Sequence, residues 1–466
     1  MNGLPADFIA LMQQQWANQA DSLFKGLEKD STPVSIRVNP KKLNAAVNLP
    51  QIPWTKNGYY LAERPSFIHD PAWHAGAYYV QEASSMLLEK ALEKIDTSTP
   101  IKALDLCGAP GGKTSHLAQI LNDESLIVSN EVIHSRASIL KQNVIQWGSP
   151  NVWVTNNDPK DFSALNSFFD LIVIDAPCSG EGMFRKDEAA RNEWSLDNVK
   201  LCASRQKRII DDVWDSLKPG GHIVYSTCTF NHFENEENLK WLSETKDIQW
   251  QTIELDISWN IHAYEENGIF GYHCFPGSVE GEGFFIAVGQ KLSGEEVRIE
   301  KPYQSKKARK PQTLDASHWS DLIYNPENYV VESLAEGQEK AIQKEWLNDL
   351  KLLSKHLKVI YSGVYLGEMK KKNLIPSHDL AMSTILNQSN THILDLDLET
   401  SLQYLRKDTF FEPSEHKGVQ LVHFQNQSLG WVKHLGNRIN SLLPSYKRVI
   451  KQPDIHNLWT LLNELN

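Results

Sequence analysis

The chain is poor in cysteine and lacks the segments that direct a protein into or across a membrane. It has five cysteines in 466 residues and no Cys-x-x-Cys pair, which argues against a disulfide framework and against a structural zinc site. No apolar run is long enough to span a bilayer, and the N-terminus lacks the basic start and apolar core of a signal peptide. We therefore expect a cytoplasmic protein with no metal site and no membrane contact.

An excess of positive charge is absent as well. The net charge is −11 and the isoelectric point is about 5.8, which by itself weakens a nucleic-acid interpretation because phosphate binding needs a positive surface. The basic residues are clustered, however, and each cluster is either a solvated face or linker, or a contact with an acidic partner. The clusters are Lys301, Lys306, Lys307, Arg309 and Lys310; Lys370, Lys371 and Lys372; and Lys433, Arg438, Lys447, Arg448 and Lys451.

The length of the chain is too great for a single ordinary core, so we expect several domains. Between residues 101 and 290, buried-strand patterns alternate with helical patterns, which indicates βαβ units and a parallel sheet. Predicted strands cover residues 102–107, 126–130, 151–155, 170–175, 222–226 and 283–289. Predicted helices cover residues 113–121, 135–147 and 197–217, the last ending at a Pro-Gly-Gly stop.

The rest of the chain divides into smaller predicted units. Residues 1–100 hold helix patterns at about 8–24 and 82–94 and a strand at 34–38, which together predict a small α+β domain. Residues 291–312 are charged and poor in large apolar side chains, so we predict a linker there. We expect an α+β domain over residues 313–392 and a small β module over residues 393–466.

A glycine-rich turn follows the first predicted strand of the α/β unit. Its sequence is Cys107-Gly108-Ala109-Pro110-Gly111-Gly112-Lys113, and the backbone amides of such a turn bind a carboxylate or phosphate. The dinucleotide and P-loop patterns are both absent, which argues against NAD and ATP. A smaller ligand with a carboxylate and one ribose fits better. Glu131 and Asp158 follow the next two predicted strands, where they would accept hydrogen bonds from ribose hydroxyls and from an adenine amino group.

Two cysteines stand at the ends of two further predicted strands. Cys178 follows Asp175-Ala176-Pro177, and Cys228 follows Ser226-Thr227. Ligands of open α/β sheets bind outside the carboxyl ends of the strands, so both thiols should face the crevice at the glycine-rich turn. S-adenosylmethionine has the carboxylate, ribose and adenine that this crevice fits, and it carries an electrophilic methyl group.

This set of side chains suits methylation of cytosine at carbon 5, which is a poor nucleophile. A thiolate that adds to carbon 6 turns the ring into an enamine-like species, and carbon 5 can then attack the methyl group. A second group must assist release of the thiol, and an acid must hold the N3 edge of the pyrimidine. Cys228, Cys178 and Asp175, in that order, supply these groups. An ordinary thiol, with a pKa of roughly 8.5, is only partly ionised at neutral pH, and a nearby sulfonium charge would favour the thiolate.

These segments resemble the Sun/nucleolar-antigen family of RNA cytosine-5 methyltransferases. The matching strings are 104–114, Asn130-Glu131-Val132 with Arg136, Asp158, 175–187, and 225–230 followed by Glu234-Asn235-Glu236. The family commonly has alanine where Gly108 stands, and we expect no loss of binding because glycine is no larger. Flanking strings resemble the RsmF-type enzymes that act on 16S ribosomal RNA; they are 35–40, 79–86, 363–367, 376–378 and 430–448.

The resemblance implies an α/β fold class, with a Rossmann-like class I methyltransferase domain whose sheet is mostly parallel and seven-stranded. It adds an RRM-like N-terminal domain that docks RNA, a first C-terminal α+β domain and a PUA-like RNA-binding domain. S-adenosyl-L-methionine is the implied cofactor, and 16S ribosomal RNA or the 30S subunit is the implied partner of a monomeric enzyme. Cys228 is implied as the nucleophile and Cys178 as the release residue. The residues implied to hold the cofactor are Cys107, Gly108, Ala109, Pro110, Gly111, Gly112, Lys113, Glu131, Asp158 and Asp175.

Three alternatives stay open at this point. By analogy with DNA cytosine-5 methyltransferases, Cys178 would attack instead of Cys228, although the second thiol would then have no role. In the second alternative the substrate is a transfer RNA, and in the third the chain is a non-catalytic RNA-binding or ribosome-assembly factor. We also hypothesise that Arg185 and Lys186 line the RNA path and that the cluster Lys370 to Lys372 binds RNA.

Overall fold

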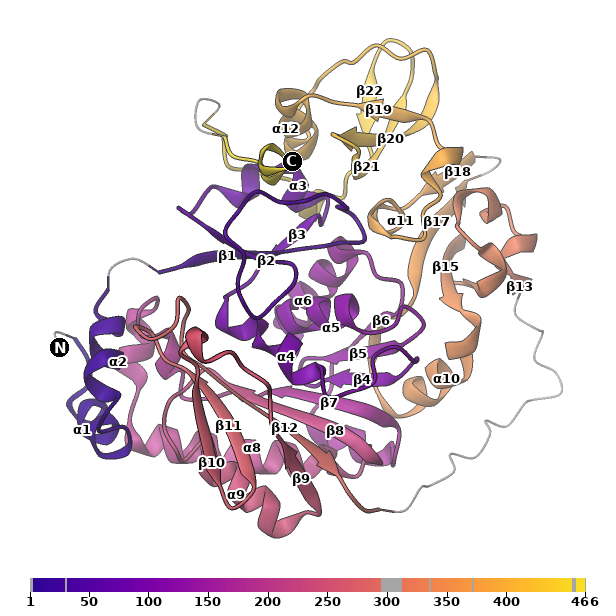
Figure 1. Cartoon of the computed structure of the whole chain (residues 1–466). Helices are drawn as coiled ribbons and strands as arrows, with labels where there is room; N and C mark the ends of the chain where they lie inside the picture. Colours follow the sequence, from indigo (N-terminus) through magenta and orange to yellow (C-terminus); the bar gives the residue numbers. More distant parts are fainter. Residues whose placement is uncertain are drawn as a thin grey trace.

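The computed structural model describes residues 3–29, 32–294, 312–334, 337–370, 373–454 and 458–465. Most of the predicted linker, the basic cluster between residues 301 and 310, and Lys371 and Lys372 therefore lie outside the described residues. The largest element is a ten-stranded sheet in the middle of the molecule (Figure 1). Its strands, in spatial order, are β10 (His262–Glu266), β11 (Ile269–Cys274), β12 (Phe284–Lys291), β8 (Leu217–Thr227), β7 (Phe169–Asp175), β4 (Lys102–Asp105), β5 (Leu126–Asn130), β6 (Val152–Thr155) and β16 (Val359–Tyr361), with β9 (Ile248–Gln251) also paired to β12.

Five neighbouring strands of this sheet, β6, β5, β4, β7 and β8, run parallel. Their side chains alternate between two buried layers, as expected for strands that are covered on both faces. In β7, Leu171 and Val173 pack into one apolar cluster, and Ile172 and Ile174 pack into the other. The first cluster includes α4 (Leu88–Leu92), α5 (Gly112–Ile120) and α6 (His134–Trp147); the second includes α8 (Leu196–Trp214) and α9 (Glu236–Thr245).

The predicted α/β fold class is confirmed, with two differences in the central sheet. It has ten strands among the described residues instead of seven, because antiparallel strands extend both edges and β16 comes from the C-terminal part of the chain. The second difference lies at the predicted end of helix 197–217. Here α8 ends at Trp214, and Leu217 is already buried in the sheet opposite Phe169. Burial of this leucine outweighs the local helix pattern.

The N-terminal region has two short helices and a small sheet. The predicted helix at 8–24 is in fact α1 (Ala6–Gln15) and α2 (Ala20–Leu27), because Trp16 leaves helical geometry and its indole N–H donates to the Phe230 carbonyl oxygen at 2.9 Å. The three-stranded sheet has the order β2 (Gly58–Leu61), β1 (Val34–Val38) and β3 (Tyr78–Val80). The predicted helix at 82–94 is a 3-10 turn, Ser84–Leu87, that continues into α4. Short helices α3 (Pro71–His74) and α7 (Glu188–Glu193) lie elsewhere in the chain.

The C-terminal part forms two further sheets. The first has the order β13 (Gln312–Thr313), β14 (Tyr329–Ser333), β15 (Gln338–Gln343), β17 (Val364–Lys370) and β18 (Asn373–Pro376), with α10 (Leu347–His356) and α11 (His378–Met382). The second has the order β19 (Ile393–Asp395), β20 (Gly418–Phe424), β21 (Gln427–His434) and β22 (Ile439–Ser441), with α12 (Leu398–Arg406). This last module shares one apolar cluster with the N-terminal sheet, so the two pack against each other (Figure 1).

The described residues give two findings on membranes and metals. They contain no helix long and apolar enough to cross a membrane. They also contain no group of three or more His, Cys, Asp and Glu side chains arranged to hold a metal ion.

Candidate active site

A cavity of about 490 Å³ lies at the carboxyl ends of the parallel strands. The ends of β4, β5 and β6 contribute Cys107, Glu131 and Asp158, as predicted from the order of strands in an open α/β sheet. The ends of β7 and β8 contribute the second half of the lining. The predicted residues in that half are Asp175, Cys178 and Cys228. Segments that are up to 121 residues apart in sequence thus meet at one hollow.

The glycine-rich turn forms one wall of the site. Gly111 has a φ of 120°, a conformation that favours glycine, and α5 begins at the next residue. Two side chains from outside the turn hold its carbonyl oxygens: Arg136 Nη2 donates to Ala109 at 2.9 Å, and Asn143 Nδ2 donates to Pro110 at 2.7 Å. Of the predicted cofactor-binding turn, Cys107 and Ala109 line the cavity itself. The remaining members, Gly108, Pro110, Gly111, Gly112 and Lys113, form the turn and the start of α5 beside it.

Gly108 is explained by its neighbour in the next strand. A Cβ atom at this position would lie 2.1 Å from Ser129 Oγ, a distance that real atoms do not tolerate. Ser129 is fully buried, and its hydroxyl lies 2.8 Å from Thr114 Oγ1 in α5. Glycine is therefore required by the serine of this chain, a reason that differs from our expectation that the smaller residue costs nothing.

The two predicted ligand acids are each held by their own turn. Glu131 accepts the Ile133 N–H at 2.9 Å, and Asp158 accepts the Lys160 N–H at 3.2 Å. Each bond uses one carboxylate oxygen. The second oxygen of Glu131 lies 3.6 Å from Arg136 Nη1. Both acids thus keep hydrogen-bonding capacity for a ligand in the cavity.

The two thiols are in direct contact. Cys178 Sγ lies 3.0 Å from Cys228 Sγ, and neither sulfur is in a disulfide. The hydrogen bond to Cys228, together with burial and the negative charge of Cys228, raises the pKa of Cys178 well above its ordinary value. The raised pKa favours the protonated thiol on Cys178.

Asp175 is held beside the thiols by two partners. Lys113 Nζ lies 2.9 Å from one carboxylate oxygen, and the Ser226 hydroxyl donates to the other at 2.9 Å. The side chain is 39% exposed, so it stays accessible to a ligand. Lys113 thereby links the start of α5 in the cofactor half of the cavity to the end of β7 in the thiol half.

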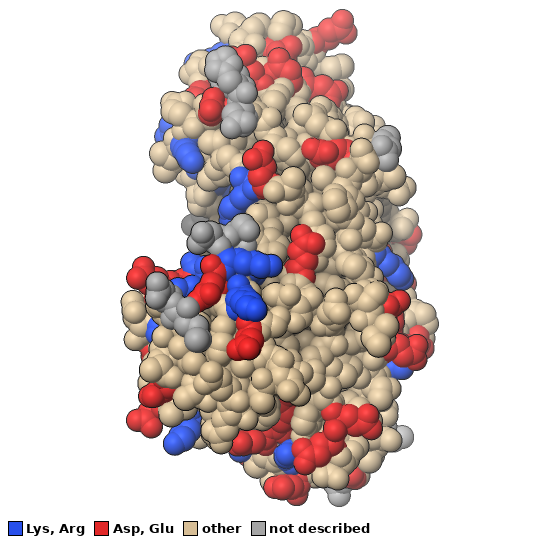
Figure 2. All heavy atoms as spheres, turned by 60° about the vertical axis from the view of Figure 1, so that its left-hand side comes forward, with Lys and Arg blue, Asp and Glu red and all other residues tan. Residues whose placement is uncertain are grey.

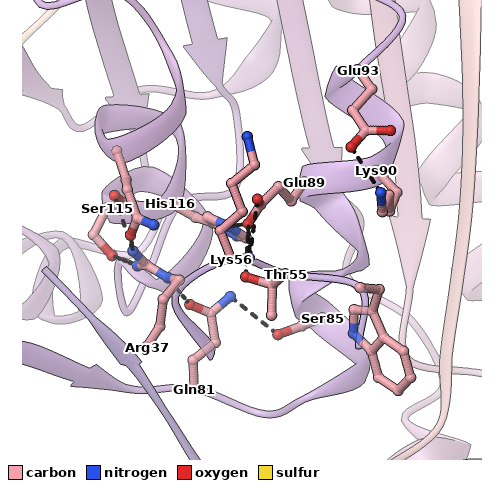
Figure 3. A network of polar contacts seen from close by, with 12 residues as sticks. Arg37, Thr55, Lys56, Gln81, Ser85, Glu89, Lys90, Glu93, Ser115 and His116 are labelled. Carbon is pink, nitrogen blue, oxygen red and sulfur yellow. Dashed lines mark hydrogen bonds and ion pairs between the residues drawn. The ribbon is translucent and has the colours of Figure 1, made fainter. Parts of the chain in front are cut away.

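Arg37, from the N-terminal domain, contacts α5, the helix that carries Lys113 (Figure 3). It comes from β1, is fully buried, and donates to the Gly112 carbonyl oxygen at 3.2 Å and to Ser115. Its guanidinium also lies 4.6 Å from the centre of the Trp147 ring and donates to Gln81 Oε1 at 2.8 Å. The N-terminal sheet therefore helps to fix α5, the helix that follows the glycine-rich turn.

The hypothesis that Arg185 lines an RNA path is wrong. Its side chain is 4% exposed, forms an ion pair with Glu282 at 3.0 Å and donates to the Gly281 carbonyl oxygen, so it is a structural clamp. Lys186 is one-third exposed and pairs with the other oxygen of Glu282. Lys370 is exposed but pairs with Glu368 at 2.7 Å.

Sequence reasoning missed other cations at the cavity. Arg205 and Arg208 in α8 are exposed and line it. Their spacing of three residues on a helix puts them on one face, a signal that was available but not specific. On the face in Figure 2, acidic side chains are widely spread and basic ones gather in small groups.

Comparison with known proteins identifies the family. A model of the 16S rRNA methyltransferase RsmB/F matches residues 91–290, and models of the RsmF N-terminal domain, first C-terminal domain and PUA domain match residues 4–83, 346–384 and 391–449. The chain is 32% identical over 434 residues to "Ribosomal RNA small subunit methyltransferase F" of Shewanella loihica, with 88% of each chain covered. The chain belongs to the RsmB/F family, in its RsmF branch. A protein of the same name from Escherichia coli O7:K1 is 32% identical over 441 residues, covering 88% of this chain and 89% of the other.

Solved structures agree with membership of the RsmB/F family. A methyltransferase homologue from Pyrococcus horikoshii is 29% identical, has a TM-score of 0.53 and covers 62% of this chain and 96% of its own. The NSun6 protein from the same organism, solved with SFG, has a TM-score of 0.52 at 19% identity over 63% and 99% of the two chains, which shows the fold alone. The predicted family, fold class and S-adenosylmethionine-dependent methyltransferase class are thereby confirmed.

Proposed function

We propose that this protein transfers a methyl group from S-adenosylmethionine to carbon 5 of a cytosine in 16S ribosomal RNA, in the cytoplasm and as a monomer. One observation carries the proposal: Cys178, Cys228 and Asp175 line the same cavity as Cys107, Glu131 and Asp158. The names of the RsmF relatives support ribosomal RNA of the small subunit as the substrate. The PUA match at residues 391–449 supports an RNA partner.

The cavity fits the proposed cofactor. It has the volume of a small-molecule site, and its walls offer the carboxylates of Glu131 and Asp158 to hydroxyl and amino groups. The glycine-rich turn and the first amides of α5 suit a carboxylate. When bound, S-adenosylmethionine supplies an electrophilic methyl group on a sulfonium centre.

Cys228 acts as the nucleophile in this proposal. Its thiolate accepts a hydrogen bond from Cys178 and adds to carbon 6 of the cytosine, which must leave its stack to reach the cavity. The new sulfur–carbon bond makes carbon 5 electron-rich, so carbon 5 can take the methyl group. Asp175 holds the N3 edge of the ring from the end of β7, while Lys113 and Ser226 keep its carboxylate in place.

Cys178 then takes the proton from carbon 5. Once Cys228 is bonded to carbon, it carries no negative charge and no longer accepts a hydrogen bond. The causes that keep the Cys178 pKa high are thereby reduced. Cys178 can lose its proton to solvent and, as a thiolate, accept the proton of carbon 5. The electron pair of that carbon–hydrogen bond restores the ring double bond and expels Cys228 as a thiolate.

Two cysteine variants test this assignment of roles. Cys228→Ala should abolish methyl transfer, because no covalent adduct can form. Cys178→Ala should accumulate a covalent protein–RNA adduct, visible as a shifted band on a denaturing gel, because release is blocked. The opposite pattern, with an adduct in Cys228→Ala and no activity or adduct in Cys178→Ala, would transfer the nucleophile to Cys178, as in the DNA enzymes.

Substrate choice and the non-catalytic alternative are tested separately. Isothermal titration with S-adenosylmethionine should show binding, and a non-catalytic assembly factor should show no heat. Bisulfite sequencing after incubation with free 16S rRNA, 30S subunits or transfer RNA should place new 5-methylcytosine in the 16S rRNA. Methylation of the transfer RNA alone would overturn the substrate proposed here.

A further inference from the structure

Two buried carboxylates lie behind the thiols and take no part in the mechanism proposed above. Glu181 begins the 3-10 turn Glu181–Met183 that follows Cys178, and Glu234 follows Cys228 in the next loop. Both are 0% exposed, and neither lines the cavity. They can therefore act on the reaction only through the residues that they contact.

Each carboxylate holds the loop that carries the other thiol. Glu234 accepts the Ser179 N–H at 3.0 Å and contacts the Ser179 hydroxyl. Glu181 accepts the backbone N–H groups of Phe230 at 2.7 Å and Asn231 at 3.0 Å. The Asn231 amide lies between them, 2.9 Å from Glu181 and 2.8 Å from Glu234. The two loops are thus tied crosswise directly beside Cys178 and Cys228.

A chain of hydroxyl groups connects the two carboxylates. The Ser179 hydroxyl lies 3.1 Å from the Thr229 hydroxyl, and Thr229 in turn donates to Glu181. Two ionised carboxylates that are fully buried and joined in this way would repel each other, so one proton between them is favoured. Glu181 meets fixed N–H donors, including the Trp194 indole at 3.0 Å, that cannot reverse. The Glu181 oxygen that contacts Thr229 also accepts two backbone N–H groups, whereas Glu234 Oε1 contacts side chains, the Ser179 hydroxyl and the Asn231 amide, and that hydroxyl can accept.

We propose that Glu181 and Glu234 are positioning residues that hold the two thiols in contact, with Glu181 ionised and Glu234 donating a proton to the Ser179 hydroxyl. The order of donation then runs from Glu234 through Ser179 and Thr229 to Glu181. In this order the hydroxyls of Ser179 and Thr229 each accept from one neighbour in the series and donate to the next, and the Asn231 amide also donates to Thr229 at 2.8 Å.

The proton on Glu234 has a consequence for thiol reactivity. Burial, and next the charge of Glu181, raises the pKa of Glu234 to about 7. Above that pH, loss of the proton adds a second negative charge behind the thiols, which opposes the thiolate form. Glu234 is already one of the groups that raise the pKa of Cys178. The titratable side chains that interact with Glu234 from neighbouring elements are Glu181, Cys178, Cys202 and Tyr225.

The two glutamine variants should differ in severity. In Glu234→Gln, the new NH₂ group donates to Ser179 where the proposal places an O–H, and the amide oxygen accepts from Ser179 N–H and Gln206 as before. The one acceptor lost is that of the Asn231 amide. We expect its Cys228 to react with iodoacetamide like the wild type below pH about 7 and several-fold faster above it. In Glu181→Gln, the NH₂ group faces backbone N–H donors. We expect alkylation of Cys228 and methyl transfer to fall about tenfold or more, with unchanged affinity for S-adenosylmethionine.

Glu237→Gln is the matched control, because this neighbouring carboxylate is exposed. If Glu181→Gln does not fold, Ser179→Ala tests the same point, since it keeps both carboxylates and cuts the hydroxyl chain. It should move the change in Cys228 alkylation to a higher pH, because the Ser179 hydrogen bond lowers the pKa of Glu234, while the protein still melts cooperatively. A milder effect of Glu181→Gln than of Glu234→Gln would show that the proton does not lie on Glu234. Alkylation curves of both variants equal to that of the Glu237→Gln control would show that neither glutamate positions the thiols.

This inference rests on the proposed function only where methyl transfer is the readout. Alkylation of Cys228, mapped by mass spectrometry, needs neither RNA nor the cofactor. An inactive wild-type protein would therefore count against the proposed function, and the alkylation curves would still decide the roles of Glu181 and Glu234.

Discussion

The two halves of the cavity are built differently. In the cofactor half, at the ends of β4, β5 and β6, Glu131 and Asp158 are held by N–H groups two residues further along the chain. In the thiol half, at the ends of β7 and β8, the holding bonds join distant segments. Ser179 and Glu234 are 55 residues apart, and Phe230 and Glu181 are 49 residues apart.

This difference predicts how each half responds to change. A local turn forms with its own strand, so single substitutions in the cofactor half should act independently of the thiols. The thiol half is one connected network, in which effects of neighbouring substitutions do not add. The contact of Lys113 with Asp175 joins the two halves, and the bond of Arg37 at the start of α5 is one of those that join the N-terminal domain to them.

The largest effect that would separate the halves is expected for Glu131→Ala. The change removes both carboxylate oxygens from the cavity and the bond to Ile133. We expect affinity for S-adenosylmethionine to fall about a hundredfold, or roughly 2.7 kcal/mol, because hydrogen bonds to a charged group are lost. Alkylation of Cys228 without cofactor should stay at the wild-type rate. Calorimetric titration and mass spectrometry measure the two quantities.

The control for this prediction is Glu124→Ala, which removes an exposed carboxylate shortly before β5. It should bind the cofactor like the wild type. If Glu131→Ala slowed alkylation of Cys228 as well, the halves would be coupled, and the contrast drawn between them would be lost.

The same contrast decides how much of the site could be predicted from the sequence. The cofactor residues and both thiols follow strand patterns, and the topology of an α/β sheet places strand ends together without further information. The contacts by which Glu181 and Glu234 hold the two thiol loops could not be predicted, because glutamate is almost never fully buried unless paired. Its partners come from another loop, and only the folded chain brings them near.

The fold, like the site, has parts that local sequence patterns predict and parts that depend on contacts distant in sequence. The parallel strands have continuous apolar patterns and were placed to within a few residues. Trp16 breaks the predicted N-terminal helix because its indole bonds to Phe230, and β16 joins the large sheet through Thr155. Both outcomes depend on contacts more than 200 residues apart in sequence, which local patterns do not contain. The predicted domain boundaries stay predictions.

A smaller effect is expected at Gly108, which tests whether the cofactor half tolerates repacking. Gly108→Ala should destabilise the protein by about 1 to 3 kcal/mol, because the new methyl group overlaps the Ser129 hydroxyl. Adding Ser129→Ala removes the closest contact and should restore part of the loss. Thermal unfolding of the two single variants and the double variant measures the coupling. Additive losses would show that Ser129 is not the residue that requires glycine.

The smallest effect is expected at the exposed edge of the cavity formed by α8, where the thiol half should meet RNA phosphates. Arg205→Gln and Arg208→Gln remove exposed cations that line the cavity. Each should weaken RNA binding only a few-fold, and each lost phosphate contact should reduce the slope of log affinity against log salt by about 0.7 to 0.9. Binding of S-adenosylmethionine should not change.

Lys207→Gln provides the matched control on the same helix. Lys207 has the same charge, lies between the two arginines in sequence, and places its ammonium group 5.8 Å from the Trp241 ring, outside the cavity lining. Filter binding over a range of salt concentrations should give it the wild-type slope. An equal fall in slope for all three variants would mean that α8 contributes only general positive charge. The thiol half would then have no phosphate contacts of its own at Arg205 and Arg208, and the RNA would be held by other parts of the protein.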